Sequence, residues 1–517
     1  MRKKCKRILT LLMALFIVAL GFGGLKVTQT AAAEDTIVLR ICSWEEYIDE
    51  GDWDEDEVID LESGDIIGEN SMLDDFCDWY YEVYGKKVVI EYSTFGTNEE
   101  LYSQLTLGDT YDLICPSDYM IMKLMTEGKL TPLSEDFFDE DNEYNYYIKG
   151  VSPFIRESFE EHEIHGEAWS EYAACFMWGT TGIVYNPDYV DEEDTKSWDI
   201  LMNEKYYRQI TVKDSVRETM IGVLGIYYED EFLDPEFIAS ETYHEDLMAM
   251  LNDTSEETVA EVEKLLKQIR ANVYSFETDS GKADMVTGKV LVNYQWSGDA
   301  VYTMDQAEED EVYLYWAVPE GSCNMWFDGW VMLKDGINGD AEKQQAAEAF
   351  INFVSRPDNA IRNMYYIGYT SSISGGDDGR IYEYLEWNYG ADEEADPEEL
   401  VEYPLGYFFS GDAEDEDYVL LVDEESTHRQ LLAQYPTQEI MDRSAIMLYF
   451  DDEANARVNQ MWINVRCFNL SQISTRDWII TGIVIAGLAL VIAAAILIKK
   501  LYVRSRVAAR IAAESKS

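Results

Sequence analysis

Short apolar runs alternate along the chain with stretches in which apolar residues recur every three or four positions. Three of the runs have the composition that is typical of strands: 36–42, 87–92 and 111–115. Between the last two, the pattern predicts a helix over 98–107, with Thr97 or Asn98 as its N-cap. Because strands alternate with helices in this way, the sequence indicates an α/β fold.

Segments farther along the chain continue the alternation. One helical face is predicted from Val259, Val262, Leu265, Leu266, Ile269 and Val273. Thr254 and Glu257 precede that face and predict a capping box. Another helix is predicted over 341–355, with Asp340 as its N-cap, and another strand over 290–296.

Two uncharged apolar runs stand near the ends of the chain. The first, 8–25, lies between a basic segment and three alanines, which predicts a signal peptide over 1–33; an uncleaved anchor is the alternative. The second, 478–498, has 21 residues, which at about 1.5 Å per residue cover roughly 30 Å, the hydrocarbon thickness of a bilayer. With Trp478 at one end and the basic tail 499–517 at the other, it predicts a transmembrane helix with a cytoplasmic C-terminus.

Charge is segregated along the chain. The 517 residues include 39 basic and 102 acidic ones, for a net charge of -63. Once both ends are set aside, residues 34–477 retain 27 basic and 101 acidic residues, a net charge of -74. This balance excludes nucleic acid as a partner, because phosphate binding needs a basic surface. A disordered acidic segment is also excluded, since 47% of the chain is hydrophobic and 13% aromatic.

The sequence lacks the common catalytic and metal-binding motifs. There is no P-loop, no G-x-S-x-G and no H-E-x-x-H, and the chain has only four histidines. Acid-rich insertions at 49–70 and 389–400 are predicted to be solvated surface. A calcium loop starting at Asp52 is disfavoured, because Glu57 and Ser63 occupy the positions that require glycine and glutamate. We therefore expect no enzyme activity, no cofactor and no metal.

The cysteines beyond the signal peptide fit either free thiols or disulfides. Their even number permits disulfides, but no close pair and no metal-ligand spacing occurs. Three of them stand in strand-like apolar stretches, where a free cysteine acts as a small hydrophobic residue. Free, buried thiols are the favoured interpretation for most of the six: Cys42, Cys77, Cys115, Cys175, Cys323 and Cys467.

Aromatic residues recur beside acids where strands are predicted to end. In the pair Trp326 and Asp328, the spacing of two residues places both side chains on one face of a strand. Open α/β sheets bind ligands beyond the carboxyl ends of their strands. An aromatic ring with a carboxylate beside it suits a cationic ligand, although an isolated tryptophan of this kind more often belongs to the core.

Ten ordered segments over about 36–470 resemble the bacterial spermidine/putrescine-binding proteins, the extracellular receptors of polyamine ABC importers. They are SWEEYI (43–48), EYSTFGTNEELYSQL (91–105), YDLICPSDY (111–119), WGTTGIVYN (178–186), SWDIL (197–201), DSVRE (214–218), YQWSGDA (294–300), WFDGW (326–330), INFVSRPD (351–358) and IGYTSS (367–372).

The resemblance implies a two-lobe periplasmic-binding-protein fold, type II-like, with a ligand cleft between the lobes. It places 34–176 and 327–371 in lobe 1 and 177–326 and 372–470 in lobe 2. A linker at 471–477 would then lead to the membrane span. The insertion at 49–70 follows the first site segment directly and could line the mouth of the cleft.

The resemblance also assigns the ligand-binding residues. They are Trp44, Glu46, Tyr47, Ser117, Tyr119, Ser215, Glu218, Trp296, Trp326, Asp328 and Tyr369. Two positions depart from the family pattern: Ser215 stands where an acid is usual, with Asp214 one position earlier, and Glu45 replaces a small polar residue. These departures bear on which amine is bound.

The function implied is a membrane-tethered receptor that captures spermidine or putrescine outside the cytoplasm. It would deliver the polyamine to separate ABC permease subunits and their ATPase, because one membrane span is too few to form a transport path. Within binding proteins, the alternatives are another small cation or a basic peptide. From a different class, the alternative is a membrane-anchored sensor or adhesion ectodomain that works without a transporter.

Overall fold

The computed structural model describes residues 36–54, 57–376, 379–391, 395 and 400–467. The predicted signal peptide, transmembrane span and basic tail lie outside the described residues. Within the described ranges, no helix combines the length and the apolar character needed to cross a bilayer.

A mixed sheet of 12 strands forms the centre of the described chain. The strands on its main path are, in spatial order, β2 (Lys87–Phe95), β1 (Thr36–Trp44), β3 (Leu113–Ile114), β12 (Cys323–Leu333), β7 (Ala173–Tyr185), β10 (Val292–Trp296), β8 (Ile210–Lys213) and β9 (Ser275–Glu277). Short strands β4 (Leu130–Thr131), β11 (Tyr315–Ala317), β13 (Thr370–Ser371) and β16 (Ser444–Ala445) pair with β7 or β12. The four strands predicted from the sequence are confirmed as β1, β2, β3 and β10.

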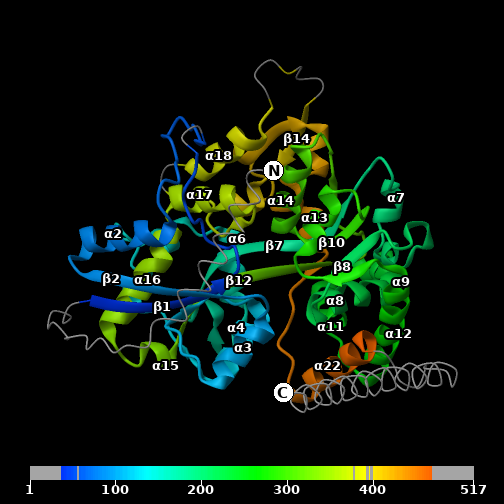
Figure 1. Cartoon of the computed structure of the whole chain (residues 1–517), viewed down its shortest axis with the longest axis horizontal. Helices are drawn as coiled ribbons and strands as arrows, with labels where there is room; N and C mark the ends of the chain where they lie inside the picture. Colours follow the sequence, from blue (N-terminus) through cyan, green and yellow to red (C-terminus); the bar gives the residue numbers. More distant parts are fainter. Residues whose placement is uncertain (1–35, 55–56, 377–378, 392–394, 396–399, 468–517) are drawn as a thin grey trace, which may run out of the picture.

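The long strands β7 and β12 connect the two ends of this sheet. At one end β1 is parallel to β2 and β3, and at the other β8 is parallel to β9 and β10. β7 pairs antiparallel with β10 and β12, and all 13 residues of β7 are buried, in keeping with a run that is apolar except for Thr180 and Thr181. The pairing between β7 and β12 changes register between Asp328 and Gly329. Figure 1 shows both strands crossing the middle of the molecule.

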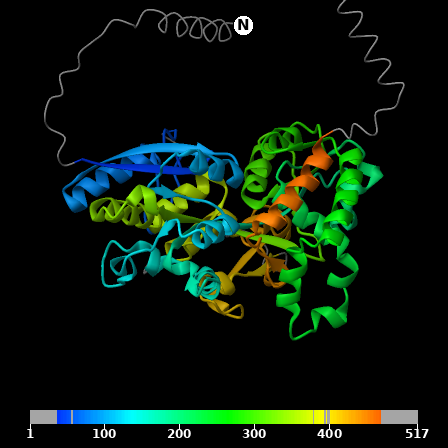
Figure 2. The same cartoon turned by 90° about the horizontal axis from the view of Figure 1, so that it is seen from below.

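Two groups of helices cover the two ends of the sheet (Figure 2). Around β1 and β2 lie α2 (Met72–Tyr84), α3 (Asn98–Leu107), α4 (Asp118–Thr126), α16 (Ala341–Val354) and α17 (Pro357–Ile367). Around β8 and β10 lie α8 (Val216–Tyr227), α11 (Tyr243–Leu251), α12 (Glu256–Asn272), α13 (Ser280–Val286), α14 (Ser297–Glu308) and α22 (Asp452–Arg466). The molecule therefore has two α/β halves that share one sheet.

Helix caps follow local sequence closely. The Thr97 side chain accepts a hydrogen bond from the Glu100 amide, and Asp340 caps α16, which confirms both predicted helix starts. The capping box predicted from Thr254 and Glu257 is wrong by one residue. Ser255 is the N-cap of α12, because the Asp253 carboxylate accepts the Ser255 amide and holds the chain in a turn up to that point.

The C-terminal part of the described chain contacts both halves. α18 (Arg380–Tyr389) packs against α17, and α19 (Gly406–Phe409) packs against α6 (Pro153–Glu161). α20 (Gln430–Gln434) packs against α14 in the other half. A hairpin of β14 (Leu400–Pro404) and β15 (Val419–Asp423) lies between these helices in sequence. The lobe boundaries inferred from the resemblance stay a prediction.

The insertion at 49–70 is more than the solvated loop that its acids predict. Asp52 and Asp54 are exposed, but Ile59, Leu61 and Ile66 are buried. Ile59 and Ile66 form an antiparallel bridge across the loop. The apolar residues are few and widely spaced, and they pack because the loop folds back on itself. Most of the second insertion, 389–400, lies outside the described residues.

The six cysteines of the described chain are free thiols. Cys42 and Cys175 are buried in β1 and β7, Cys115 follows β3, and Cys323 begins β12. Burial raises the pKa of the Cys175 thiol well above its usual value, so this side chain is a packed apolar group.

Candidate ligand-binding site

A cavity of about 560 Å³ lies where residues from both halves converge, and we call it the cleft. Most of the predicted site residues line it. They are Trp44, Glu46, Tyr47, Ser117, Glu218, Trp296, Trp326, Asp328 and Tyr369. The cleft lies at the carboxyl ends of β1 and β10 and beside the irregular part of β12, where an open α/β sheet binds ligands.

Asp328 presents a buried carboxylate to the cleft. Its side chain accepts hydrogen bonds of 2.7 Å from the hydroxyls of Tyr47 and Ser117, one on each oxygen. Ser117 is oriented in turn by Asn98, whose amide donates to the Ser117 hydroxyl at 3.0 Å. Burial raises the pKa of Asp328 to about 7, although both hydrogen bonds act to lower it. No lysine or arginine of the described chain forms an ion pair with this carboxylate.

Glu218 is a second buried carboxylate in the cleft. It lies in the first turn of α8, is 7% exposed, and accepts a hydrogen bond from Ser215. Burial and the nearby Glu99 carboxylate raise the pKa of Glu218 to about 7. No described cationic side chain lies within ion-pair distance of it. Both carboxylates therefore bear an electrostatic cost that a cationic ligand would remove.

Aromatic rings enclose these carboxylates. The ring of Tyr369 lies 5.1 Å from that of Tyr47 and 5.7 Å from that of Trp326, measured between centroids. Two glycines leave the space that these rings fill. A Cβ at Gly298 would lie 2.2 Å from the Tyr369 ring, and one at Gly179 would lie 2.7 Å from the Trp326 ring. Gly298 and Gly179, which follow Trp296 and Trp178 in their motifs, thus shape the cleft because a glycine leaves room for these rings.

Three predicted residues stand apart from this centre. Tyr119 is buried outside the cleft lining, and its hydroxyl donates to Glu99 at 3.1 Å. Ser215 also lies outside the lining and reaches the cleft only through Glu218. The Glu46 side chain is 86% exposed and lies at the mouth, 4.0 Å from Lys282.

An ion-pair cluster in the wall of the cleft was missed in the sequence. Asp299 lies 3.3 Å from the ammonium of Lys213 and 3.6 Å from that of Lys282. The hydroxyl of Tyr369 donates at 3.0 Å to Oδ1 of the same carboxylate, the oxygen that also faces Lys282. A signal was available, because Lys213 is a lone cation that ends an apolar strand in a strongly acidic chain.

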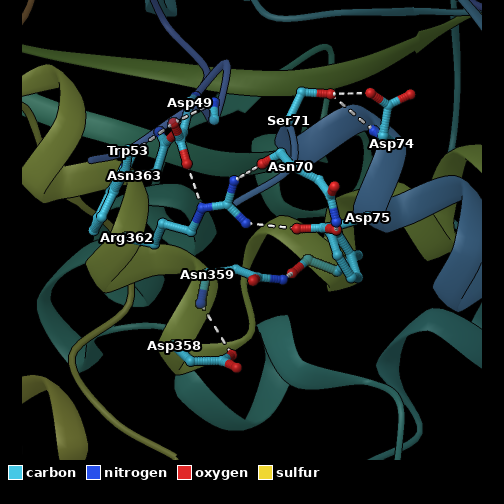
Figure 3. Close-up of polar contacts among 12 residues, drawn as sticks. Asp49, Trp53, Asn70, Ser71, Asp74, Asp75, Asp358, Asn359, Arg362 and Asn363 are labelled. Atoms are coloured by element: carbon cyan, nitrogen blue, oxygen red, sulfur yellow. Dashed lines mark hydrogen bonds and ion pairs between the residues drawn. The ribbon is translucent and has the colours of Figure 1, made fainter. Parts of the chain in front are cut away.

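The segment that carries Tyr47 is held in place by α17, and Figure 3 shows the contacts that Arg362 of this helix makes with Asp49 and Asp75. Arg362 pairs with the buried Asp49 and with Asp75, the latter at 2.6 Å. Asn363 accepts the Asp49 amide at 2.9 Å and donates to the Tyr47 carbonyl at 3.4 Å. The start of the insertion thus positions the hydroxyl donor that contacts Asp328.

Two α/β halves joined by shared strands, with a cavity at their junction, define the class of two-lobe periplasmic-binding proteins. The chain belongs to the family of bacterial extracellular solute-binding proteins, whose family model matches residues 78–380, more than half of its length. The expectation of a binding protein rather than an enzyme is thereby confirmed.

Several characterised proteins are similar to this chain. The spermidine/putrescine-binding periplasmic protein of Salmonella typhimurium is 25% identical over 355 residues, covering 68% of this chain and 82% of that protein. The putrescine-binding periplasmic protein SpuD of Pseudomonas aeruginosa is 26% identical over 350 residues, covering 66% and 80%.

A solved structure supports the fold. The spermidine/putrescine ABC transporter substrate-binding protein PotD of Streptococcus pneumoniae superimposes with a TM-score of 0.53 at 22% identity. The match covers 83% of this chain and 98% of that one. At this identity the likeness confirms the two-lobe α/β fold that the sequence predicted.

Proposed function

We propose that this protein captures polyamines outside the cytoplasm and delivers them to an ABC permease. The observation that carries the proposal is the pair Asp328 and Glu218, two buried carboxylates that face one aromatic cavity and have no ion-pair partner among the described residues. Such a site is complementary to an extended chain of methylenes with ammonium groups.

The chemistry of the cleft supports an amine over a sugar or an anion. A charge-assisted hydrogen bond contributes about 1.5–3 kcal/mol, so two carboxylates with aromatic contacts suffice for micromolar binding. Methylenes of the ligand would lie against Trp326 and Tyr369, which are largely desolvated already. Contacts from both halves would favour the closed arrangement of the lobes, since a ligand shifts a conformational equilibrium only through differential affinity.

The cellular location of the protein is part of the proposal. Residues 1–33 would be removed as a signal peptide. A transmembrane helix over 478–498 would then tether the binding domain on the outer side of the cell membrane, with the C-terminus in the cytoplasm. Relatives named as spermidine/putrescine-binding periplasmic proteins support the ligand class and the extracytoplasmic location. The permease subunits and their ATPase would be separate chains.

Substitution of Asp328 tests the proposal. In Asp328→Asn we expect putrescine to bind at least about tenfold more weakly by isothermal titration calorimetry, because the ammonium loses its charged partner. Asp335→Asn is the matched control, since this exposed acid follows the far end of the same strand and should leave the affinity unchanged.

A thermal-shift panel completes the test. We expect putrescine or spermidine to raise the melting temperature of the wild-type protein. Stabilisation by a sugar or an anion, with no effect of any amine, would overturn the polyamine assignment. Equal putrescine affinity in Asp328→Asn and wild type would remove Asp328 from the site.

A further inference from the structure

Lys213 is a cation that lies directly behind the wall of the cleft, in contact with residues that line it. It ends β8, its side chain is fully buried, and its ammonium donates to the Thr278 carbonyl at 3.0 Å and to Asp299 at 3.3 Å. The same ammonium lies 3.9 Å from the centre of the Trp296 ring. A buried lysine paired with a carboxylate and stacked on an indole occupies the kind of position that a polyamine's own ammonium would occupy.

The acids of the cleft fall into four groups. Asp299 is neutralised by Lys213 and Lys282. Lys282 also approaches the two exposed acids at the mouth, Asp279 at 2.9 Å and Glu46 at 4.0 Å. Glu45 and Glu50 are exposed, so water screens them. Only two of the acids that line the cleft are buried without an ion pair in the described chain, and they are Asp328 and Glu218.

We propose that Lys213 takes the place of a third ligand ammonium, so that the cleft selects diamines over triamines. This inference rests on the proposed function and specifies its ligand. Two unpaired buried carboxylates match the two ammonium groups of a diamine. A triamine would bring its third ammonium to a wall whose carboxylate is already neutralised by two lysines, where it would lose hydration without gaining a partner.

Trp296 supports the same selection. An indole attracts a cation through the electron density of its ring faces, and Lys213 already holds one of those faces. A ligand ammonium on the same ring would meet the repulsion of the lysine charge in a site of low dielectric. The ring therefore serves as an apolar wall for methylenes, and Lys213 is a specificity-determining residue.

The test compares putrescine, a diamine, with spermidine, a triamine, by isothermal titration calorimetry. For the wild-type protein we expect putrescine to bind at least about tenfold more tightly. In Lys213→Met, which removes the charge and keeps an unbranched side chain, spermidine affinity should rise about tenfold or more, while putrescine affinity changes less than about threefold. In Lys213→Met combined with Asp299→Asn, that gain should vanish, because the freed carboxylate is gone.

Lys289→Met is the matched control. Lys289 pairs with Asp284 outside the lining of the cleft, so the same change of charge there should leave both affinities as in wild type. Circular dichroism and melting temperature establish that each variant is folded. If Lys213→Met does not fold, the test rests on whether the wild-type protein binds putrescine more tightly than spermidine.

Each failure has a distinct meaning. Equal or tighter binding of spermidine by the wild-type protein would overturn the role of Lys213 and leave the polyamine function standing. The role of Lys213 would also be overturned if the ratio of putrescine affinity to spermidine affinity were the same in a folded Lys213→Met variant as in the wild-type protein. Absence of binding of either amine to the wild-type protein would overturn the proposed function itself.

Discussion

Asp328 and Glu218 differ from the other acids that line the cleft in their surroundings rather than in their type. Most carboxylates of the chain are solvated, and at about 0.15 M ionic strength a screening length of roughly 8 Å isolates them from the cleft. Burial raises the pKa of these two side chains to about 7. Their protonation thus changes within the physiological range, and the affinity for a cation must change with it.

The affinity for putrescine should therefore depend on pH. Below pH 7 the two carboxyl groups are increasingly protonated in the empty cleft, and an ammonium ligand must displace those protons. We expect the affinity to fall by more than tenfold between pH 8 and pH 5.5, with protons released on binding near pH 7. Calorimetry in buffers of different ionisation enthalpy measures both quantities.

Glu218→Gln provides the control for this pH dependence. The glutamine oxygen can still accept the Ser215 hydroxyl, but the side chain no longer titrates. The variant should bind more weakly at pH 8 and show a shallower dependence on pH. An affinity that stays constant from pH 5.5 to pH 8 in the wild-type protein would show that neither carboxylate pairs with the ligand.

At the scale of residues, most of the site residues predicted from the sequence line the cleft, but the sequence did not indicate the lysines that pair with its acids. Trp326 and Asp328 could be paired because their spacing is local. The pair between Lys213 and Asp299 joins positions 86 residues apart on different elements, and no periodicity reveals it. Tyr119 was predicted as a site residue, and it lies outside the cleft lining, buried beside Arg217.

Among the elements, the insertion at 49–70 departs most from its sequence pattern. Its first residue, Asp49, is buried against Arg362 of α17 and also accepts the Trp53 indole N–H at 3.2 Å. The Trp53 ring lies 5.1 Å from that of Tyr365, on the same helix. The insertion is thus attached to α17, and α17 leads directly into the segment that holds Tyr369.

Removal of the Arg362 charge should destabilise the protein strongly. In Arg362→Met the Asp49 carboxylate would stay buried without its cation, which typically costs about 3–5 kcal/mol in the free energy of unfolding. Urea denaturation followed by circular dichroism measures this change. A loss below about 1 kcal/mol would mean that the pair is dispensable.

Arg356→Met is the comparison for this variant. Arg356 pairs with Asp358 at the start of the same helix, and about a third of each side chain is exposed. Ion pairs exposed to this degree contribute about 1 kcal/mol or less. The difference between the two variants therefore isolates the effect of burial from that of charge.

Elements that depend on residues close together in the sequence, such as helix caps, were predicted well. Elements that depend on partners far away in the sequence were not. Thr97 and Asp340 cap helices within three residues of themselves, so the sequence indicates them directly. Asp49 and Arg362 are 313 residues apart, and in a segment crowded with acids one buried aspartate has no distinguishing pattern. Hydrophobic periodicity likewise failed for Ile59 and Ile66, which pack across a folded loop.

For the whole molecule, the net charge of -74 over residues 34–477 acts on encounter rather than on recognition. A field of this sign raises the local concentration of cations and speeds their capture. Recognition is concentrated in a few side chains at the junction of the halves. The sheet order and the shared strands could be anticipated only from the resemblance, because pairing between β7 and β12 joins segments far apart in the chain.

The irregular pairing of β12 with β7 lies at Asp328, so a ligand in the cleft would contact the strands that join the two halves. The register of β12 against β7 shifts between Asp328 and Gly329, and the Gly329 amide donates to the Pro116 carbonyl at 3.0 Å. The residue without a partner at this shift is Phe176 of β7, and a bulge bends the strand that carries the extra residue and loosens the ladder. A ligand that pairs with Asp328 would therefore attach to β12 directly opposite the point where β7 bends.

Hydrogen–deuterium exchange should record this attachment as local stiffening. Amide protons of residues 327–331 should exchange more slowly once putrescine saturates the cleft, while those of α22, which packs on α12, should exchange at an unchanged rate. If exchange at residues 327–331 stayed the same with putrescine bound, ligand binding would have no effect on the irregular part of the strand. Where protection does appear, the carboxylate that recognises the ligand also restrains the strands that join the two halves.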